Sequence, residues 1–221
     1  MMTRLTAMTA LGLLAACGSA GAGGGQAEAQ RKADAKPLTI AGVGIGMSAT
    51  AAQAALAADG WKAETFPGRD WTATVAEEAG RQRNAPLVDR PRTGVEAIQA
   101  VKGDEKLIVD LRPVPSGAEV RFVQYEAPMA GRSASEVGTQ LVKRYGPASL
   151  SSAPGAPLAM TWCTGGERCR SENGSAKPAL GAREDVYHKL RLFLSGGGDG
   201  DRAWQANVQR AAGGSGAKAS F

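Results

Sequence analysis

The sequence has a single histidine, His188, and three cysteines among its 221 residues. So few ligands exclude a zinc site built from paired cysteines and histidines. One histidine also leaves one candidate base for a serine nucleophile, and no G-x-S-x-G elbow accompanies it. Under period-two alternation His188 shares a strand face with Leu190 and Leu192, which predicts a half-buried structural residue. We therefore expect a protein that is not an enzyme and that holds no cofactor and no metal.

Aromatic residues are also scarce, at 5%, so the core should be aliphatic and rich in alanine. The net charge is +5, but the lysines and arginines are scattered among acids and form no run. A nucleic-acid partner is therefore not expected. Hydrophobic residues make up 43% and charged residues 21%, which is typical of a soluble globular chain.

No apolar run approaches the roughly 20 residues that a transmembrane helix needs. The stretch from Leu5 to Ala16 is apolar over about a dozen residues, and Arg4 precedes it. Small residues, Ala15 and Ala16, end the stretch, as a cleavage site requires. Residues 1–16 are therefore interpreted as a signal peptide.

The four residues Leu14-Ala15-Ala16-Cys17 resemble the lipobox of bacterial lipoproteins. This resemblance implies cleavage before Cys17 and attachment of lipid, including palmitate, to that residue. Gly18 stands where an aspartate would signal retention at the inner membrane. The resemblance thus implies a lipid anchor in the bacterial outer membrane, facing the periplasm. The alternatives are an ordinary secretory signal in which Cys17 lies near the cut by chance, and a short apolar segment with no targeting role.

Glycine, alanine and charged residues dominate the segment 17–36, which we interpret as the lipidated cysteine and a flexible tether. Such a tether has a root-mean-square span on the order of 25 Å. If Cys17 carries lipid, Cys163 and Cys169 in "WCTGGERC" are the two cysteines that remain. The oxidising compartment outside the cytoplasm would join them in a disulfide bond. The alternatives are a redox pair or half of a metal site, although a C-x₂-C spacing would suit either better.

Two stretches of the sequence begin alike, "GMSATAAQAALAADGW" at 46–61 and "GRSASEVGTQLVKRYGP" at 131–147. Each predicts a helix that opens at a serine N-cap, Ser48 in the first and Ser133 in the second. Glu136 adds a capping box to the second helix. A glycine closes each stretch, as helix ends commonly require.

Strand-like segments follow each of these helices, and a further helix is expected over 70–84. The predicted strands span 95–101, 106–112 and 119–126 in the first half and 158–163, 186–194 and 202–209 in the second. The run "GGGDGD" at 196–201 is interpreted as a hairpin turn, and 171–182 as a polar loop. The fold class is therefore α+β: capped helices packed on an antiparallel β-meander, as a tandem repeat of a helix-plus-three-strand unit. The units are 37–127 and 128–213, followed by a disordered tail, 214–221.

A capped helix followed by a meander, in a chain with a lipobox, is similar to the BamE-like (SmpA/OmlA) small outer-membrane lipoproteins. Two such units in tandem also resemble the architecture of β-lactamase-inhibitor proteins. The first resemblance implies a periplasmic, membrane-tethered interaction module that binds an envelope protein in outer-membrane assembly or maintenance. The alternative is an inhibitor or ligand-binding lipoprotein that contacts its target through the loop 162–169. Trp162 and Arg168 are its candidate contact residues, since both types are common at binding hot spots.

Overall fold

The computed structural model describes residues 37–86, 88–153, 155–164, 169 and 178–215. The signal peptide 1–16, Cys17 and the tether up to residue 36 lie outside these residues, as does Arg168. The described elements, in chain order, are α2 (Ala49–Ala58), β1 (Lys62–Gly68), α3 (Trp71–Gln82), β2 (Gly94–Lys102), β3 (Glu105–Val114), β4 (Gly117–Pro128), α4 (Ala134–Tyr145), β5 (Leu150–Ser151), β6 (Ala159–Cys163), β7 (Ala179–Glu184), β8 (Lys189–Ser195) and α5 (Gly197–Ser215).

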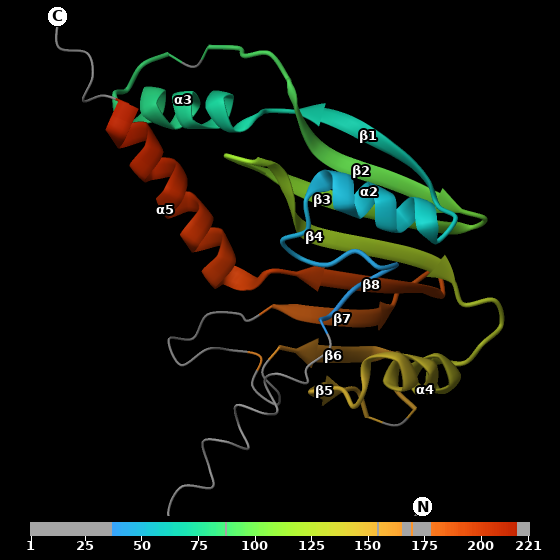
Figure 1. Cartoon of the computed structure of the whole chain (residues 1–221). Coiled ribbons are helices and arrows are strands. Elements are labelled where there is room, and N and C mark those ends of the chain that lie inside the picture. The colour runs from blue at the N-terminus through green and yellow to red at the C-terminus, as the bar shows by residue number, and fades with distance from the viewer. Residues whose placement is uncertain (1–36, 87, 154, 165–168, 170–177, 216–221) are drawn as a thin grey trace, which may run out of the picture. The chain divides into compact units, whose positions relative to one another are not determined.

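All eight of these strands form one antiparallel sheet with the order β1-β2-β3-β4-β8-β7-β6-β5 (Figure 1). The α+β prediction is confirmed. Strands β4 and β8, one from each predicted unit, pair at the centre of the sheet from Phe122↔Ser195 to Pro128↔Lys189. A single sheet therefore runs through both predicted units.

The predicted helix starts are confirmed at the level of single hydrogen bonds. The Ser48 hydroxyl accepts from the backbone N–H of Ala51 and begins α2. At α4, Ser133 and Glu136 form the expected reciprocal capping box. The Asp70 carboxylate accepts from the N–H of Ala73 at 2.7 Å and caps α3 in the same way. These caps are local, which is why four residues of sequence suffice to predict them.

Helices α2 and α4 cover one face of the sheet, and the main core lies between them and the strands (Figure 1). The helices contribute Ala52, Leu56, Val137 and Leu141 to this core. The strands contribute alternate residues, among them Ile98, Leu107, Val109, Leu111, Val120, Val123, Leu180, Leu192 and Leu194. Since side chains alternate along a strand, the residues between these point to the opposite face.

The predicted strand at 202–209 is wrong, because these residues form the middle of helix α5. The hairpin turn predicted at 196–201 is wrong as well, since α5 begins at Gly197. Alternation along a strand would place Trp204, Ala206 and Val208 on one buried face, but Ala206 is exposed. The buried positions are Val208 and Ala212, four residues apart, as a helix requires. Helix α5 packs against α3, a contact that local alternation cannot reveal.

Three strands were not predicted, and each lacks a clean alternating pattern. Strand β1 is an edge strand, mostly exposed, and it contains Pro67 and a bulge. Strand β5 has only two residues. Strand β7 occupies part of the loop predicted at 171–182, and Gly181 interrupts its apolar residues. At the C-terminus, α5 continues to Ser215, so the helix includes the first two residues of the predicted tail 214–221.

Candidate functional site

The predicted binding loop at 162–169 begins with a buried residue, Trp162, and is closed by a disulfide bond. Trp162 is only 3% exposed, so its assignment as a contact residue is wrong. Its ring packs against Tyr145 at 5.5 Å between centroids, on the core face of β6. The disulfide between Cys163 and Cys169 is confirmed. Arg168 lies outside the described residues.

The face of the sheet opposite α2 and α4 is the larger candidate surface, and we call it the open face. Register places its side chains in rows across the strands. One row joins Asp110, Phe122 and Ser195, and the next joins Ile108, Gln124 and Phe193. These side chains are partly or well exposed, whereas most of their chain neighbours are buried, among them Leu107, Val109, Val123, Leu192 and Leu194. The core residues of α2 and α4 lie on the other face, and the start of α5 meets the open face at Arg112, whose Nη1 donates to the Gly200 carbonyl.

Aromatic rings and an arginine meet at the middle of the open face. The Phe122 and Phe193 rings lie 6.2 Å apart between centroids, one on each of the two central strands. The guanidinium carbon of Arg183 lies 4.7 Å from the centroid of the Phe193 ring. Gly181 stands opposite Phe193 across the ladder and adds no side chain beside the ring. We call Phe122, Phe193 and Arg183 the aromatic–arginine cluster. An exposed cation held over aromatic rings can bind a carboxylate while the rings bury apolar surface.

Basic side chains outnumber acidic ones on the strands of the open face. The basic set is Lys62, Lys106, Arg112, Arg183, Lys189 and Arg191. The acidic set is Glu64, Asp110, Glu119 and Glu126. Two of these acids are already paired within the sheet. Within the described chain, Arg183 has no carboxylate partner.

Glu126 is the most heavily paired acid of the open face. Its carboxylate lies 2.6 Å from Lys189 Nζ and 3.2 Å from Arg191 Nη2. The hydrogen bond from Lys189 lowers the pKa of Glu126 below its ordinary value, and the charges of Lys189 and Arg191 act in the same direction. Glu119 similarly accepts from Arg112 Nε at 2.8 Å. These two acids therefore pair with three of the six basic side chains of the face, Arg112, Lys189 and Arg191.

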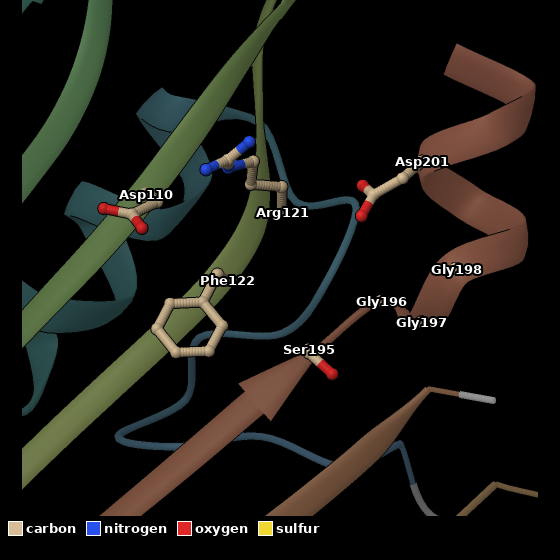
Figure 2. A pocket seen from close by; sticks show the side chains of 8 residues that line it. All are labelled: Asp110, Arg121, Phe122, Ser195, Gly196, Gly197, Gly198 and Asp201. Atoms are coloured by element: carbon tan, nitrogen blue, oxygen red, sulfur yellow. The ribbon is translucent and has the colours of Figure 1, made fainter. Parts of the chain in front are cut away.

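An open cavity of about 490 Å³ lies where β3, β4 and β8 meet the start of α5 (Figure 2). Its lining includes Asp110, Arg121, Phe122, Ser195 and Asp201, together with the glycines that lead into α5. Asp201 also pairs with Arg112 at 3.2 Å. The cavity contains a hydroxyl and carboxylates, but its lining has no histidine. Among the described residues no cluster of three or more metal-ligating side chains occurs.

His188 is not the half-buried strand residue that the alternation predicts. It lies in the turn between β7 and β8, with a φ of 55°, and its side chain is 86% exposed. Its Nδ1 lies 2.7 Å from a Glu184 carboxylate oxygen. Strand β8 begins at Lys189, three residues later than predicted, so the imidazole lies in the turn and outside the alternating pattern. The cavity lies at the other end of β8, beside Ser195.

Within the described part of the chain, no helix combines the length and the apolar character needed to cross a bilayer. No protein family, curated protein or solved structure matches the chain.

Proposed function

We propose that this chain is a membrane-tethered, non-enzymatic interaction module of the bacterial cell envelope, which docks a partner protein on its open face. The lipobox at residues 14–17 and the following tether support the membrane anchor. A lipid on Cys17 would hold the folded part near the outer membrane on its periplasmic side. Outer-membrane assembly or maintenance is the process proposed for it.

The open face is chosen as the docking surface because of one observation, the aromatic–arginine cluster. Phe122 and Phe193 offer apolar surface, and Arg183 offers a cation with no carboxylate partner in the described chain. Arginine and aromatic residues are the types that contribute most at protein interfaces. The exposed guanidinium of Arg183, which has no carboxylate partner in the described chain, indicates the chemistry of the partner. The docking surface of that partner is acidic.

The experiment uses cells that express the full chain with a photo-crosslinking amino acid at Gln124, at the centre of the open face. The same amino acid at Thr139, exposed on α4, is the matched control for the opposite face. The proposal expects one envelope protein crosslinked from position 124 and not from position 139. Arg183→Glu should abolish that crosslink, because it opposes an acidic surface. Equal crosslinking from both positions, or none from 124, would count against the open face.

The anchor is tested separately by cell fractionation and labelling with palmitate. The wild type should label and sediment with membranes, and Cys17→Ser should do neither. An unlabelled wild type in the soluble fraction would remove the lipoprotein part of the proposal and leave the open face to be judged by crosslinking.

The alternative function, an inhibitor or ligand-binding lipoprotein, keeps the disulfide at 163–169 as its support. Because Trp162 is buried, Arg168 is its one remaining contact residue among the two predicted. Arg168→Glu and Arg183→Glu therefore separate the two functions. Loss of the partner with the first and not the second would favour the loop.

A further inference from the structure

Two opposite charges line the cavity beside Ser195 without forming an ion pair with each other. The Asp110 carboxylate comes from β3 and the Arg121 guanidinium from the adjacent strand, β4 (Figure 2). Within the described chain, neither side chain has a hydrogen-bond or ion-pair partner. The other carboxylate of the lining, on Asp201, is paired with Arg112 at 3.2 Å. The cavity therefore presents one unpaired carboxylate and one unpaired guanidinium.

A β-bulge directs Arg121 into the cavity. The ladder between β3 and β4 pairs Asp110 with Phe122 and Leu111 with Val120. Arg121 is therefore an extra residue of β4, with no partner across this ladder. Because of the bulge, Arg121 and Phe122 both line the cavity, whereas regular alternation would turn one of the two toward the core. Bulges are common beside functional sites, where they redirect a side chain in this way.

The remaining walls of the cavity add an apolar ring, a hydroxyl group and backbone. The ring belongs to Phe122, and the hydroxyl group belongs to Ser195 at the end of β8. Gly196, Gly197 and Gly198 contribute backbone atoms alone. The volume of about 490 Å³ is in the range of small-molecule sites. A small ligand with an apolar part therefore fits the size and the lining of the cavity.

The two unpaired charges indicate the chemistry of that ligand. A carboxylate binds cations, and a guanidinium binds carboxylates with a close geometric match. A ligand that satisfies both Asp110 and Arg121 must therefore carry an ammonium group and a carboxylate. We propose that the cavity binds a small zwitterion, either a free amino acid or a short peptide. Its ammonium group contacts Asp110, its carboxylate contacts Arg121, and its apolar side chain packs on the Phe122 ring. This binding activity is additional to the docking of a partner protein and does not depend on it.

The test is isothermal titration calorimetry with the full chain purified in detergent. The ligands are leucine and the dipeptide leucyl-leucine, each also in an N-acetylated form and as a carboxyl-terminal amide. The zwitterionic forms should bind, and blocking either end should weaken binding by about tenfold or more. Tighter binding of leucine than of the dipeptide would support a free amino acid as the ligand, and the reverse order would support a short peptide.

Two variants assign each end of the ligand to its residue. Arg121→Gln should weaken binding of leucine by about tenfold or more and remove the preference for leucine over its amide. Asp110→Asn should instead remove the preference for leucine over its N-acetylated form. The matched controls are Arg210→Gln and Asp104→Asn, at exposed positions outside the cavity lining, and both should bind leucine as the wild type does.

Three results would overturn the inference. They are no binding of either zwitterion up to about 10 mM, equal binding of the blocked forms, and unchanged affinity in both cavity variants. The proposed function is judged separately, by the crosslink from position 124. Loss of that crosslink with leucine still bound would remove the docking proposal alone, and the opposite outcome would remove the zwitterion site alone.

Discussion

The indole N–H of Trp162 donates a 2.8 Å hydrogen bond to the carbonyl oxygen of Gly146, the C-cap of helix α4. Strand β6 is thereby joined to the end of the helix that covers it. A tryptophan with its N–H satisfied and its ring in the core stabilises the fold. Its position explains why this residue is unavailable to a partner.

Replacement of Trp162 should therefore affect stability. Trp162→Ala is expected to lower the free energy of unfolding by about 3–5 kcal/mol, because it leaves a cavity. Trp162→Phe should cost less, mainly for the lost hydrogen bond. Chemical denaturation measures both, with Tyr187→Ala as the exposed aromatic control, expected within about 0.5 kcal/mol of the wild type. Equal losses of stability in Trp162→Ala and Tyr187→Ala would contradict the position of Trp162 in the core.

The disulfide should stabilise the fold by a modest amount. Cys163 and Cys169 close a short loop, with a sequence separation of 6. The loop-entropy relation gives about 2 kcal/mol for a ring of this size. The double variant Cys163→Ser/Cys169→Ser should show this loss in denaturant, and reductant should then have no further effect on it. A reductant-sensitive unfolding curve in the double variant would contradict the prediction.

Acid should weaken the pairing of Glu126 with Lys189 and Arg191. Since the folded pKa of Glu126 lies below its ordinary value of 4.5, its stabilising effect is present above that pH. The effect is lost as the pH falls through the folded pKa. The free energy of unfolding, measured between neutral and acidic pH, should fall less steeply in Glu126→Gln than in the wild type. Lys189→Met should also flatten the profile, and three superimposable profiles would refute the pairing.

A close strand contact depends on two glycines. Gly68 and Gly94 face each other at the end of the β1–β2 ladder. A Cβ on Gly94 would lie 2.6 Å from the carbonyl oxygen of Arg69, where backbone must move. Gly94→Ala is expected to destabilise the protein by about 1–3 kcal/mol in denaturant. Gly80→Ala in α3 meets no atom within 4 Å and should stabilise by about 0.5–1 kcal/mol. A change of the same sign in the free energy of unfolding of both variants would contradict the close contact at Gly94.

Helix α5 can be tested at an exposed residue in its interior. Ala206→Pro removes a helical hydrogen bond and should cost about 3 kcal/mol. Ala206→Ser at the same position should cost less than about 1 kcal/mol. Thermal unfolding with circular dichroism measures both the stability and the helix content. A proline variant as stable as the serine variant would argue against a helix at this position.

Much of the fold was predictable because its signals are local. Ser48, and Ser133 with Glu136, begin helices through bonds that span only a few residues. Leu107, Val109 and Leu111 alternate along β3 and are all buried, so the meander could be read from its period. The disulfide between Cys163 and Cys169 was predictable from the cysteine count, because these two are left once Cys17 is assigned to lipid. In each case the stabilising contact lies within the segment that carries the signal.

The tertiary structure decided what local patterns leave open. The positions of Trp204 and Val208 suit either a strand or a helix, and packing of α5 on α3 selects the helix. The composition of the loop made Trp162 a plausible contact residue, and only its neighbour Tyr145 and the Gly146 carbonyl place it in the core. Likewise, Phe122 and Phe193 lie far apart in sequence and meet because β4 pairs with β8. Sequence by itself determined the periods and the caps, which depend on neighbouring residues. The open face depends on contacts between distant strands, which no local pattern encodes.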